Sequence, residues 1–323
     1  MKAGTLTSKL EGLKNNSNYI FDSGIYRHKS VYTKTQEQTA KCFGFKWEKR
    51  STYESNAMAQ ASLKWLSERY ALPDISLADL TKGKAFLDAG CGSAHSASLL
   101  FAELLNSCNY LGVDISNAVD VAKERFTEKG LCGNFLQANI LDLPEEIGNF
   151  DIIFSEGVLH HTDSTERAIK YLSTRLVAEG YLMFYVYSKK SPIREFADDY
   201  IRSKIAPLTN EEAWEALEPL TKLGMLLGEL NIELDIKNAV DVLGIPAGKI
   251  NLQRLFYWHF FKAYYRPEFS FEEMNHINFD WYRPFNCHRQ TPEQVKDWVE
   301  SCGLDILKMD VQESGITVVA RKN

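Results

Sequence analysis

The chain has 323 residues, enough to bury a substantial core as one large domain or two ordinary ones. Hydrophobic residues make up 45% and charged residues 25%, which is typical of a soluble globular enzyme. A diffuse net charge of −6 gives no electrostatic footprint for a nucleic-acid backbone, although a local basic patch would be hidden in this average.

The six cysteines are scattered, and none of them forms a C-x-x-C pair. Free thiols of this kind fit a reducing compartment. The N-terminus carries no secretory signal, and no apolar run is long enough to cross a bilayer. We therefore expect a cytoplasmic protein with no membrane partner and no metal site.

Residues 1–34 are polar and weakly patterned, and we expect them to form an arm that packs on the body. Helical character begins at Thr35, and a second helix is predicted over residues 56–70 from its apolar face. Pro73 ends that region. We predict that residues 1–80 form an arm and helices that cap the site.

Strands and helices then alternate, and this alternation predicts a parallel sheet. Strands are expected at residues 85–88, 110–114, 134–138, 150–154 and 181–187. Ser116 can cap the second of the intervening helices, and Asp163 with Glu166 forms a capping box for the helix that follows the fourth strand.

The alternation stops at Ser188, and about a hundred helical residues of high aromatic density follow, with a capping box at Thr209 and Glu212. The earlier pattern resumes at Thr291, which precedes a proline at a helix start. Residues 304–311 and 315–320 then predict an antiparallel pair of strands. We therefore assign residues 81–187 and 291–323 to the core and residues 188–290 to an insertion over the substrate site.

The clearest chemical signal is the run from Phe86 to Ala94, in which a strand ends in Asp88 and a Gly-Cys-Gly turn follows. The two glycines let the backbone turn sharply beside a ligand. A dinucleotide site would have a third glycine where His95 stands, and Asp88 would repel a pyrophosphate. The turn therefore favours a ligand with a positively charged amino-acid moiety.

Three more segments follow in order. Asp114 ends the second strand, where an acidic residue commonly binds the two hydroxyls of a ribose. Asn139 and Ile140 begin the run N-I-L-D-L-P after the third strand. The fourth strand leads into S-E-G-V-L-H-H-T, which contains His160 and His161.

Together, these segments over residues 84–187 resemble the class I S-adenosylmethionine-dependent methyltransferases. The resemblance implies a Rossmann-like, mostly parallel seven-stranded sheet with an antiparallel C-terminal hairpin and a helical lid insertion. It also implies S-adenosyl-L-methionine as the cofactor. The residues expected to bind it are Asp88, Gly90, Cys91 and Gly92 near the methionine part, Asp114 and Ile115 near the ribose, Asn139 and Ile140 at the adenine, and Ser155 with Glu156. The family often has Asp in place of Asn139, so the contact with the adenine amino group would be neutral.

The catalytic candidates are His160 and His161, because neutral histidine can take the proton that a hydroxyl nucleophile loses. A His-His pair at this place also accompanies different substrates in the family, so a structural or cofactor-orienting role is an equal alternative. Cys91 is expected to be a small packing residue rather than a nucleophile.

The segments around Trp47 and residues 281–289 look like those that flank the core of bacterial small-molecule methyltransferases. The aromatic run at 255–265 could be lid core, pocket wall, a membrane-facing surface or a contact in a homodimer. Arg283, His288 and Arg289 could bind an acidic substrate group or form a solvated loop. The candidate substrate-binding residues are Trp47, Tyr257, Phe261, Tyr282, Arg283, His288 and Arg289.

The predicted reaction is transfer of a methyl group to an O, N, S or C atom of a small-molecule acceptor. Positioning and exclusion of water would supply most of the catalysis, with the insertion and the arm closing as lids. Two alternatives remain open. One is other chemistry of the same cofactor, such as transfer of another alkyl group, and the other is a non-catalytic cofactor-binding protein. The sequence does not identify the acceptor.

Overall fold

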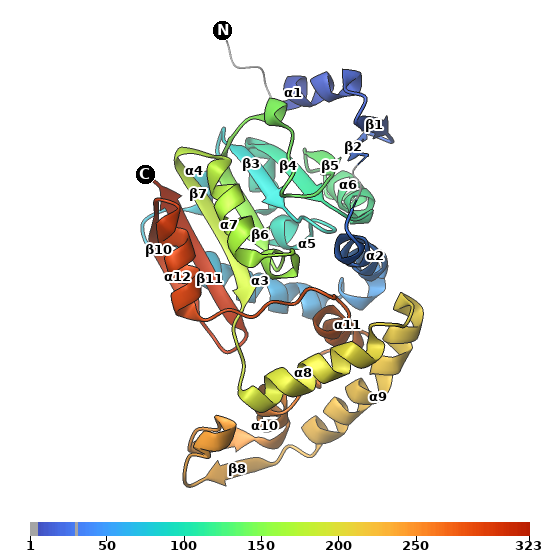
Figure 1. Cartoon of the computed structure of the whole chain (residues 1–323), viewed down its shortest axis with the longest axis vertical. Helices are drawn as coiled ribbons and strands as arrows, with labels where there is room; N and C mark the ends of the chain where they lie inside the picture. The colour runs from blue at the N-terminus through green and yellow to red at the C-terminus, as the bar shows by residue number, and fades with distance from the viewer. Residues whose placement is uncertain (1–5, 30–31) are drawn as a thin grey trace. The chain divides into compact units, whose positions relative to one another are not determined.

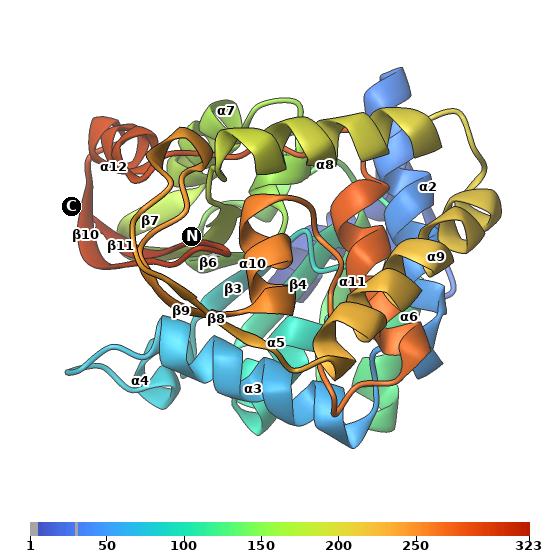
Figure 2. The same ribbon diagram turned by 90° about the horizontal axis from the view of Figure 1, so that it is seen from below.

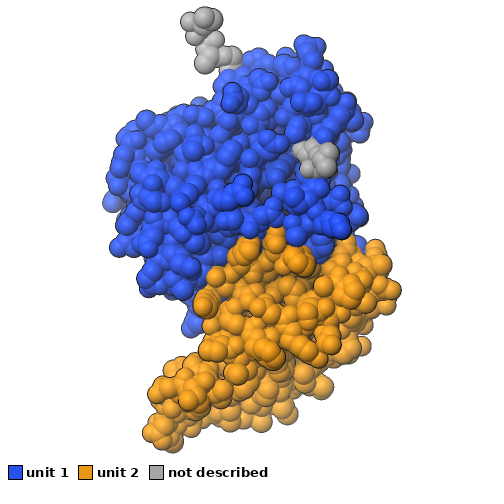
Figure 3. All heavy atoms as spheres, viewed as in Figure 1, with its two compact units in different colours: residues 1–48, 61–188, 290–323 blue, residues 49–60, 189–289 orange. Residues whose placement is uncertain are grey.

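The computed structural model describes residues 6–29 and 32–323, which form two compact units (Figures 1 and 3). The first unit comprises residues 1–48, 61–188 and 290–323, and the second comprises residues 49–60 and 189–289. No helix of the described residues combines the length and the apolar character that a membrane span requires. The assignment of residues 1–80 and 188–290 to caps and lids stays a prediction.

The first unit is built on a sheet that has nine strands in the described residues, in the order β1-β2-β5-β4-β3-β6-β7-β11-β10 (Figure 1). The strands from β2 to β7 pair in parallel, and β1–β2, β7–β11 and β11–β10 pair antiparallel. Their bounds are β1 Tyr19–Asp22, β2 Ile25–His28, β3 Ala85–Ala89, β4 Asn109–Asp114, β5 Asn134–Gln137, β6 Phe150–Glu156, β7 Leu176–Tyr187, β10 Leu304–Val311 and β11 Gly315–Lys322. The Rossmann-like sheet with its reversed C-terminal hairpin is confirmed.

Two of the nine strands were not predicted, because the N-terminal arm is a β-hairpin rather than an irregular segment. Asp22 pairs with Ile25 across a two-residue loop, in which Ser23 and Gly24 both have positive φ, at 51° and 77°. Such a loop matches the twist of two antiparallel strands. Tyr26 of β2 then pairs in parallel with Leu136 of β5, so the hairpin extends the sheet.

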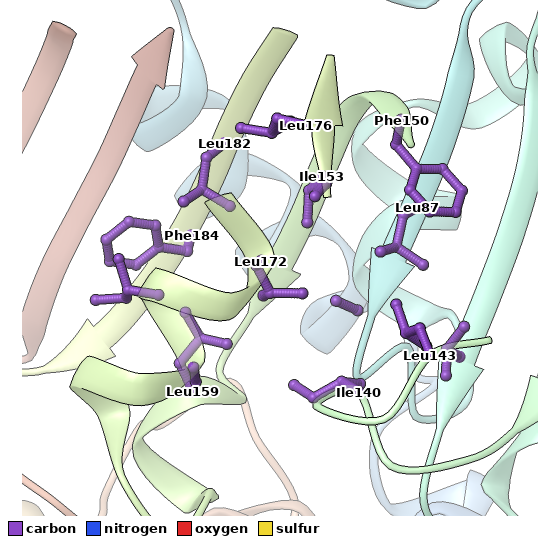
Figure 4. Close-up of a cluster of buried hydrophobic side chains, with 14 of the residues drawn as sticks. Leu87, Ile140, Leu143, Phe150, Ile153, Leu159, Leu172, Leu176, Leu182 and Phe184 are labelled. Carbon is purple, nitrogen blue, oxygen red and sulfur yellow. The ribbon is translucent and has the colours of Figure 1, made fainter. Parts of the chain in front are cut away.

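Helices cover both faces of this sheet, and neighbouring residues of one strand face opposite layers. One apolar layer contains Leu87 and Leu172 (Figure 4) and packs against α1, α7 and α12, of which α7 and α12 lie in front of the strands in Figure 1. The other contains Phe86 and packs against α3, α4, α5 and α6. The helix bounds are α1 Leu6–Gly12, α2 Lys34–Glu48, α3 Asn56–Tyr70, α4 Leu77–Thr81, α5 His95–Leu100, α6 Ala118–Glu128, α7 Thr165–Thr174 and α12 Pro292–Ser301.

The second unit is mainly helical, as predicted, but its described part also contains a two-stranded antiparallel sheet. In both views of the ribbon, α9 and α11 lie side by side (Figures 1 and 2). Thr221 of α9 shares hydrogen bonds with Asn275 and Asn278 of α11, all three fully buried. The element bounds are α8 Pro192–Ile205, α9 Asn210–Glu229, β8 Glu233–Ile236, β9 Gly248–Asn251, α10 Leu252–His259 and α11 Phe271–Tyr282.

The helix starts test the capping predictions. The capping box predicted at Thr209 is present, with its reciprocal side-chain bond, and the helix start predicted at Thr291 also has a capping box. The box predicted at Asp163 is wrong, because Ser164 is the N-cap of α7 and its hydroxyl accepts a hydrogen bond from the Arg167 N–H. At α6 the Ser116 hydroxyl does accept the Ala118 N–H at 3.2 Å, although the N-cap is the residue after it.

Candidate active site

The glycine-rich turn after β3 is held from several directions. The amides of Gly90 and Cys91 both donate to the Val113 carbonyl, at 2.7 and 2.9 Å. The Arg125 guanidinium, on α6, donates to the Ser93 carbonyl at 2.7 Å. Because these groups come from β4 and α6, the turn is fixed by the neighbouring βα unit.

Glycine is required at both ends of this turn. Gly90 has a φ of +81°, and a Cβ there would overlap the Val158 side chain. Gly92 has a φ of +51°, and a Cβ there would lie 2.5 Å from the Trp47 indole nitrogen. L-residues with side chains rarely adopt this backbone conformation. Trp47, a predicted substrate residue, thus packs against the predicted cofactor turn.

Asp88 is the last residue but one of β3 and is 3% exposed. One carboxyl oxygen accepts a hydrogen bond from the Tyr110 hydroxyl at 2.7 Å. Burial raises the pKa of Asp88 to about 7, the Tyr110 hydrogen bond opposes this rise, and the nearby Asp114 adds to it. A positive charge placed beside this buried carboxyl would therefore stabilise its ionised form.

Asp114 ends β4 and is also buried. One of its oxygens accepts the Gly92 N–H at 2.8 Å, and the other accepts both the N–H and the hydroxyl of Ser116, at 2.8 and 2.6 Å. Burial raises the pKa of this carboxyl, while the Ser116 and Gly92 hydrogen bonds and the Lys46 charge lower it. Ile115 is half-buried, and its carbonyl lies 3.4 Å from the Gln137 amide nitrogen.

A third carboxyl, that of Glu156, ends β6. It accepts a hydrogen bond from the Tyr70 hydroxyl on α3. Burial raises the pKa of Glu156 to about 7; Tyr70 and Arg69 oppose the rise, and Asp88 adds to it. Ser155, the residue before it, is buried and donates to the Ala89 carbonyl at 2.8 Å. Tyr70 is a residue that the sequence did not single out, since it reads there as an ordinary apolar helix position.

Cys91 is buried, and burial raises the pKa of its thiol well above the usual range, with Asp88 and Asp114 adding to the rise. It is therefore a neutral thiol, as a packing residue would be. Asn139 forms a local turn by accepting the Leu141 N–H at 2.9 Å. Ile140 is 5% exposed and belongs to the core layer shown in Figure 4. The adenine contact of these two residues stays a prediction.

His160 and His161 lie in a short 3₁₀ turn, residues 159–161, and both are buried. The His160 ring lies 3.7 Å from the Tyr187 ring and 4.2 Å from the His161 ring, measured between centroids. The His161 ring lies 5.1 Å from that of Phe43 on α2. The pair therefore belongs to an aromatic cluster within the first unit, and its role as a base stays a prediction.

The remaining predicted substrate residues all lie in the second unit, where several are tied to neighbours. Arg289 binds Glu195 and both carboxyl oxygens of Asp199. Arg283 donates to the Asn210 side chain and the Leu208 carbonyl. The side chains of Tyr257, Phe261 and His288 are half-buried, whereas that of Tyr282 is fully buried. Their contact with substrate stays a prediction.

Residues 87–184 match the family model described as a methyltransferase domain. A human relative named probable tRNA methyltransferase 9B is 30% identical over 149 residues, which are 45% of this chain and 30% of that protein. An uncharacterized protein of Synechococcus sp. is 34% identical over 35% of this chain and 28% of its own length. The chain thus spans about a third or less of the curated relatives it matches.

Another relative, the tRNA U34 carboxymethyltransferase of Aliivibrio salmonicida, is 33% identical over 32% of each chain. Among solved structures, magnesium protoporphyrin IX methyltransferase from Synechocystis aligns over 90% of this chain and all of that one. That alignment has a TM-score of 0.46 and 13% identity. The matched residues 87–184 contain the glycine-rich turn and the three strand-end carboxyls described above. The chain therefore carries a methyltransferase domain over residues 87–184, whose cofactor is S-adenosylmethionine.

Proposed function

We propose that the whole chain is a methyltransferase that transfers the methyl group of S-adenosylmethionine to a small-molecule acceptor. The observation that carries the proposal is the arrangement of Asp88 and Asp114, two buried carboxyls on either side of a turn whose glycines leave no room for side chains. The free thiols, which include all six cysteines, support a place in the reducing cytoplasm.

The residues present fit this cofactor. The raised pKa of Asp88 means that its buried negative charge lacks compensation, which the α-ammonium of the cofactor would supply. Asp114 accepts three hydrogen bonds from Gly92 and Ser116. A carboxylate has about four acceptor positions, so it can still accept a ribose hydroxyl.

When bound, S-adenosylmethionine supplies a methyl group already activated for direct displacement. The protein's task is then to orient the acceptor and to exclude water. We propose that the second unit acts as a lid and carries the acceptor contacts. His160 or His161 would take the proton of an acceptor hydroxyl or, in the alternative role, hold the end of β7 through Tyr187.

A small acceptor is favoured over RNA because the chain has a net charge of −6 and would need a basic mouth to bind a phosphate backbone. RNA is the alternative acceptor to test, because two relatives are named as probable tRNA methyltransferases. The relative named carboxymethyltransferase favours, as a second candidate function, transfer of a larger alkyl group from the same pocket.

Calorimetric titration with S-adenosylmethionine, S-adenosylhomocysteine and NAD tests the cofactor. We expect micromolar binding of both sulfur nucleosides and none of NAD. Asp88→Asn should weaken binding by more than about 30-fold, because one partner of a buried charge pair is lost. The matched control is Asp297→Asn, at an exposed position of α12, which should bind as the wild type does.

Acceptor identity follows from a screen of small molecules and of tRNA, read as formation of S-adenosylhomocysteine. Binding of NAD, or of neither sulfur nucleoside, would contradict the proposal. Turnover with tRNA but with no small molecule would replace the small acceptor by RNA.

A further inference from the structure

The carboxyl of Glu156 has one oxygen that is held and one that is open. The Tyr70 hydroxyl donates to Oε2. Tyr70 is fully buried, and its ring packs against that of Phe154 on β6, at 5.2 Å between centroids. Among the residues that the structure describes, none forms a hydrogen bond or ion pair with the other oxygen, Oε1. Glu156 is half-buried and Oε1 is not one of the enclosed atoms, so solvent reaches this oxygen.

Glu156 lies beside the glycine-rich turn. The residue before it, Ser155, donates its hydroxyl hydrogen bond to the Ala89 carbonyl at 2.8 Å. Two residues after it, the Val158 side chain occupies the space that a Cβ on Gly90 would need. Because the chain contacts the turn on both sides of Glu156, the open carboxyl oxygen belongs to the same site as the turn.

The surroundings of Glu156 disfavour a negative charge. Burial raises the pKa of Glu156 to about 7, and the charge of Asp88 adds to the rise. The Tyr70 hydrogen bond and the Arg69 charge, both on α3, oppose the rise without cancelling it. Arg69 donates its hydrogen bonds to three neutral side chains of the β10–β11 hairpin instead of to this carboxyl. A second negative charge at this place would therefore meet both burial and repulsion.

The order of the strands indicates which part of the reaction takes place near Glu156. The strands β5, β4, β3 and β6 are neighbours in the sheet, in that order. In the proposed function the adenine lies at the end of β5, the ribose at Asp114 of β4, and the methionine part at Asp88 of β3. The next strand end in this row is that of β6, and an acceptor that approaches there meets Glu156. In a direct displacement the methyl group lies between sulfur and acceptor, and therefore on the same side.

We propose that Glu156 is a specificity-determining residue, which admits an uncharged methyl group to the place of transfer and excludes a negatively charged group such as carboxymethyl. Repulsion between like charges in a partly buried site supplies the discrimination. The inference rests on the proposed function and chooses between its two candidates, transfer of methyl and transfer of a larger alkyl group. It assigns Glu156 to the transferred group, whereas Asp88 holds the amino-acid part.

The test uses the full chain and two donors that differ only in the transferred group. One is S-adenosylmethionine, and the other is S-adenosylhomocysteine alkylated on sulfur with iodoacetate, which carries carboxymethyl in place of methyl. Both are titrated in calorimetry at pH 8 into wild type, Glu156→Gln and the control Glu124→Gln, at an exposed position of α6. The measured quantity is the dissociation constant of the carboxymethyl donor divided by that of S-adenosylmethionine.

We expect this ratio to be equal in wild type and Glu124→Gln and to fall about 10- to 100-fold in Glu156→Gln, because the repelling charge is removed. Glutamine has the size of glutamate, so a preference that rests on size alone would persist in Glu156→Gln. S-adenosylhomocysteine lacks the transferred group and should bind all three proteins equally, which also shows that the variants are folded.

A second measurement needs no variant. At pH 6, below the Glu156 pKa of about 7, the wild-type ratio should fall toward that of Glu156→Gln, because less of the carboxyl is ionised. Asp88 titrates in the same range, but the two donors carry the same ammonium, so its ionisation affects both alike.

A ratio that is the same in wild type and Glu156→Gln would overturn the proposal, as would tighter binding of the carboxymethyl donor than of S-adenosylmethionine by wild type. Weaker binding of S-adenosylhomocysteine to Glu156→Gln would also overturn it, because Glu156 would then hold the amino-acid part. Failure of the wild type to bind S-adenosylmethionine and S-adenosylhomocysteine would instead refute the proposed function.

Discussion

Replacing Asp88 with asparagine should make the unliganded protein more stable at high pH while removing its cofactor affinity. In the folded protein the pKa of Asp88 rises from its ordinary 3.8 to about 7, mainly through burial. At 1.36 kcal/mol per pH unit, keeping this carboxylate ionised costs about 4 kcal/mol when the pH is well above 7. Asparagine keeps an oxygen that can accept the Tyr110 hydroxyl and carries no charge.

The sign follows from the raised folded pKa. The contribution of a protonated Asp88 to stability is fully present below pH 3.8 and is lost as the pH rises through about 7. Between pH 5 and pH 9 this loss amounts to about 3 kcal/mol of unfolding free energy in the wild type. The asparagine amide adds a penalty of about 1–3 kcal/mol if its N–H groups stay unpaired, but this offset does not vary with pH.

Urea unfolding of wild type, Asp88→Asn and the control Asp297→Asn at pH 5, 6, 7, 8 and 9 measures the effect. The free energy of unfolding of Asp88→Asn minus that of wild type should increase by about 3 kcal/mol across this series. The same difference for Asp297→Asn should stay flat. A flat or falling difference for Asp88→Asn would refute the reasoning that the ionised carboxylate is held in the fold at a cost.

A linked measurement concerns protons. Because a bound ammonium favours ionised Asp88, binding of S-adenosylhomocysteine near pH 7 should release protons. The apparent binding enthalpy should therefore differ between buffers of low and high ionisation enthalpy. Equal enthalpies in the two buffers would show that Asp88 does not change its protonation.

The remaining predictions concern the turn, a helix cap and the third carboxyl. Gly90→Ala should lower the unfolding free energy by about 2–5 kcal/mol, from the positive φ together with the overlap with Val158, and thermal unfolding reads this directly. Ser164→Ala should cost about 1 kcal/mol by removing the cap of α7, and an unchanged melting temperature would speak against Ser164 as the N-cap. Tyr70→Phe should raise the pKa of Glu156 above about 7, because the hydrogen bond that opposes burial is lost, and carboxyl ¹³C NMR would show a lower value if this is mistaken.

The sequence predicted the parallel core well, because each strand there is an apolar run bounded by a turn signal. The helix at residues 56–70 and the hairpin strand at 304–311 have the bounds expected from their patterns. The N-terminal hairpin was missed since its strands have four residues each and its signal is only the pair Ser23-Gly24. Asp163 and Ser164 are adjacent and can both cap a helix, so the sequence pattern alone cannot decide which of them is the N-cap of α7.

The residues of the candidate site also fall into two groups, those that the sequence predicted and those that it missed. Asp88, Asp114 and Glu156 lie at the carboxyl ends of neighbouring parallel strands or one residue before, so chain order alone brings them to the same edge of the sheet. Tyr70 and Tyr110 donate to two of these carboxyls, and in the sequence both look like core aromatics. Their role depends on where α3 and β4 lie in space. Tertiary packing determines which hydroxyl reaches each carboxyl, and the local sequence around the two tyrosines does not indicate it.

The added hairpin changes which backbone of the sheet is open to pairing. Without β2, the N–H and C=O groups along one side of β5 would be an unprotected template for a strand of another molecule. Arg27 of β2 holds the hairpin against β5 and α6, because its guanidinium donates hydrogen bonds to the side chains of Gln137 at 2.7 Å and Asp120 at 2.6 Å. The outermost strand on this side is then β1, which has four residues, as β5 does. The hairpin thus makes β1, instead of β5, the strand whose backbone is open to pairing on this side of the sheet.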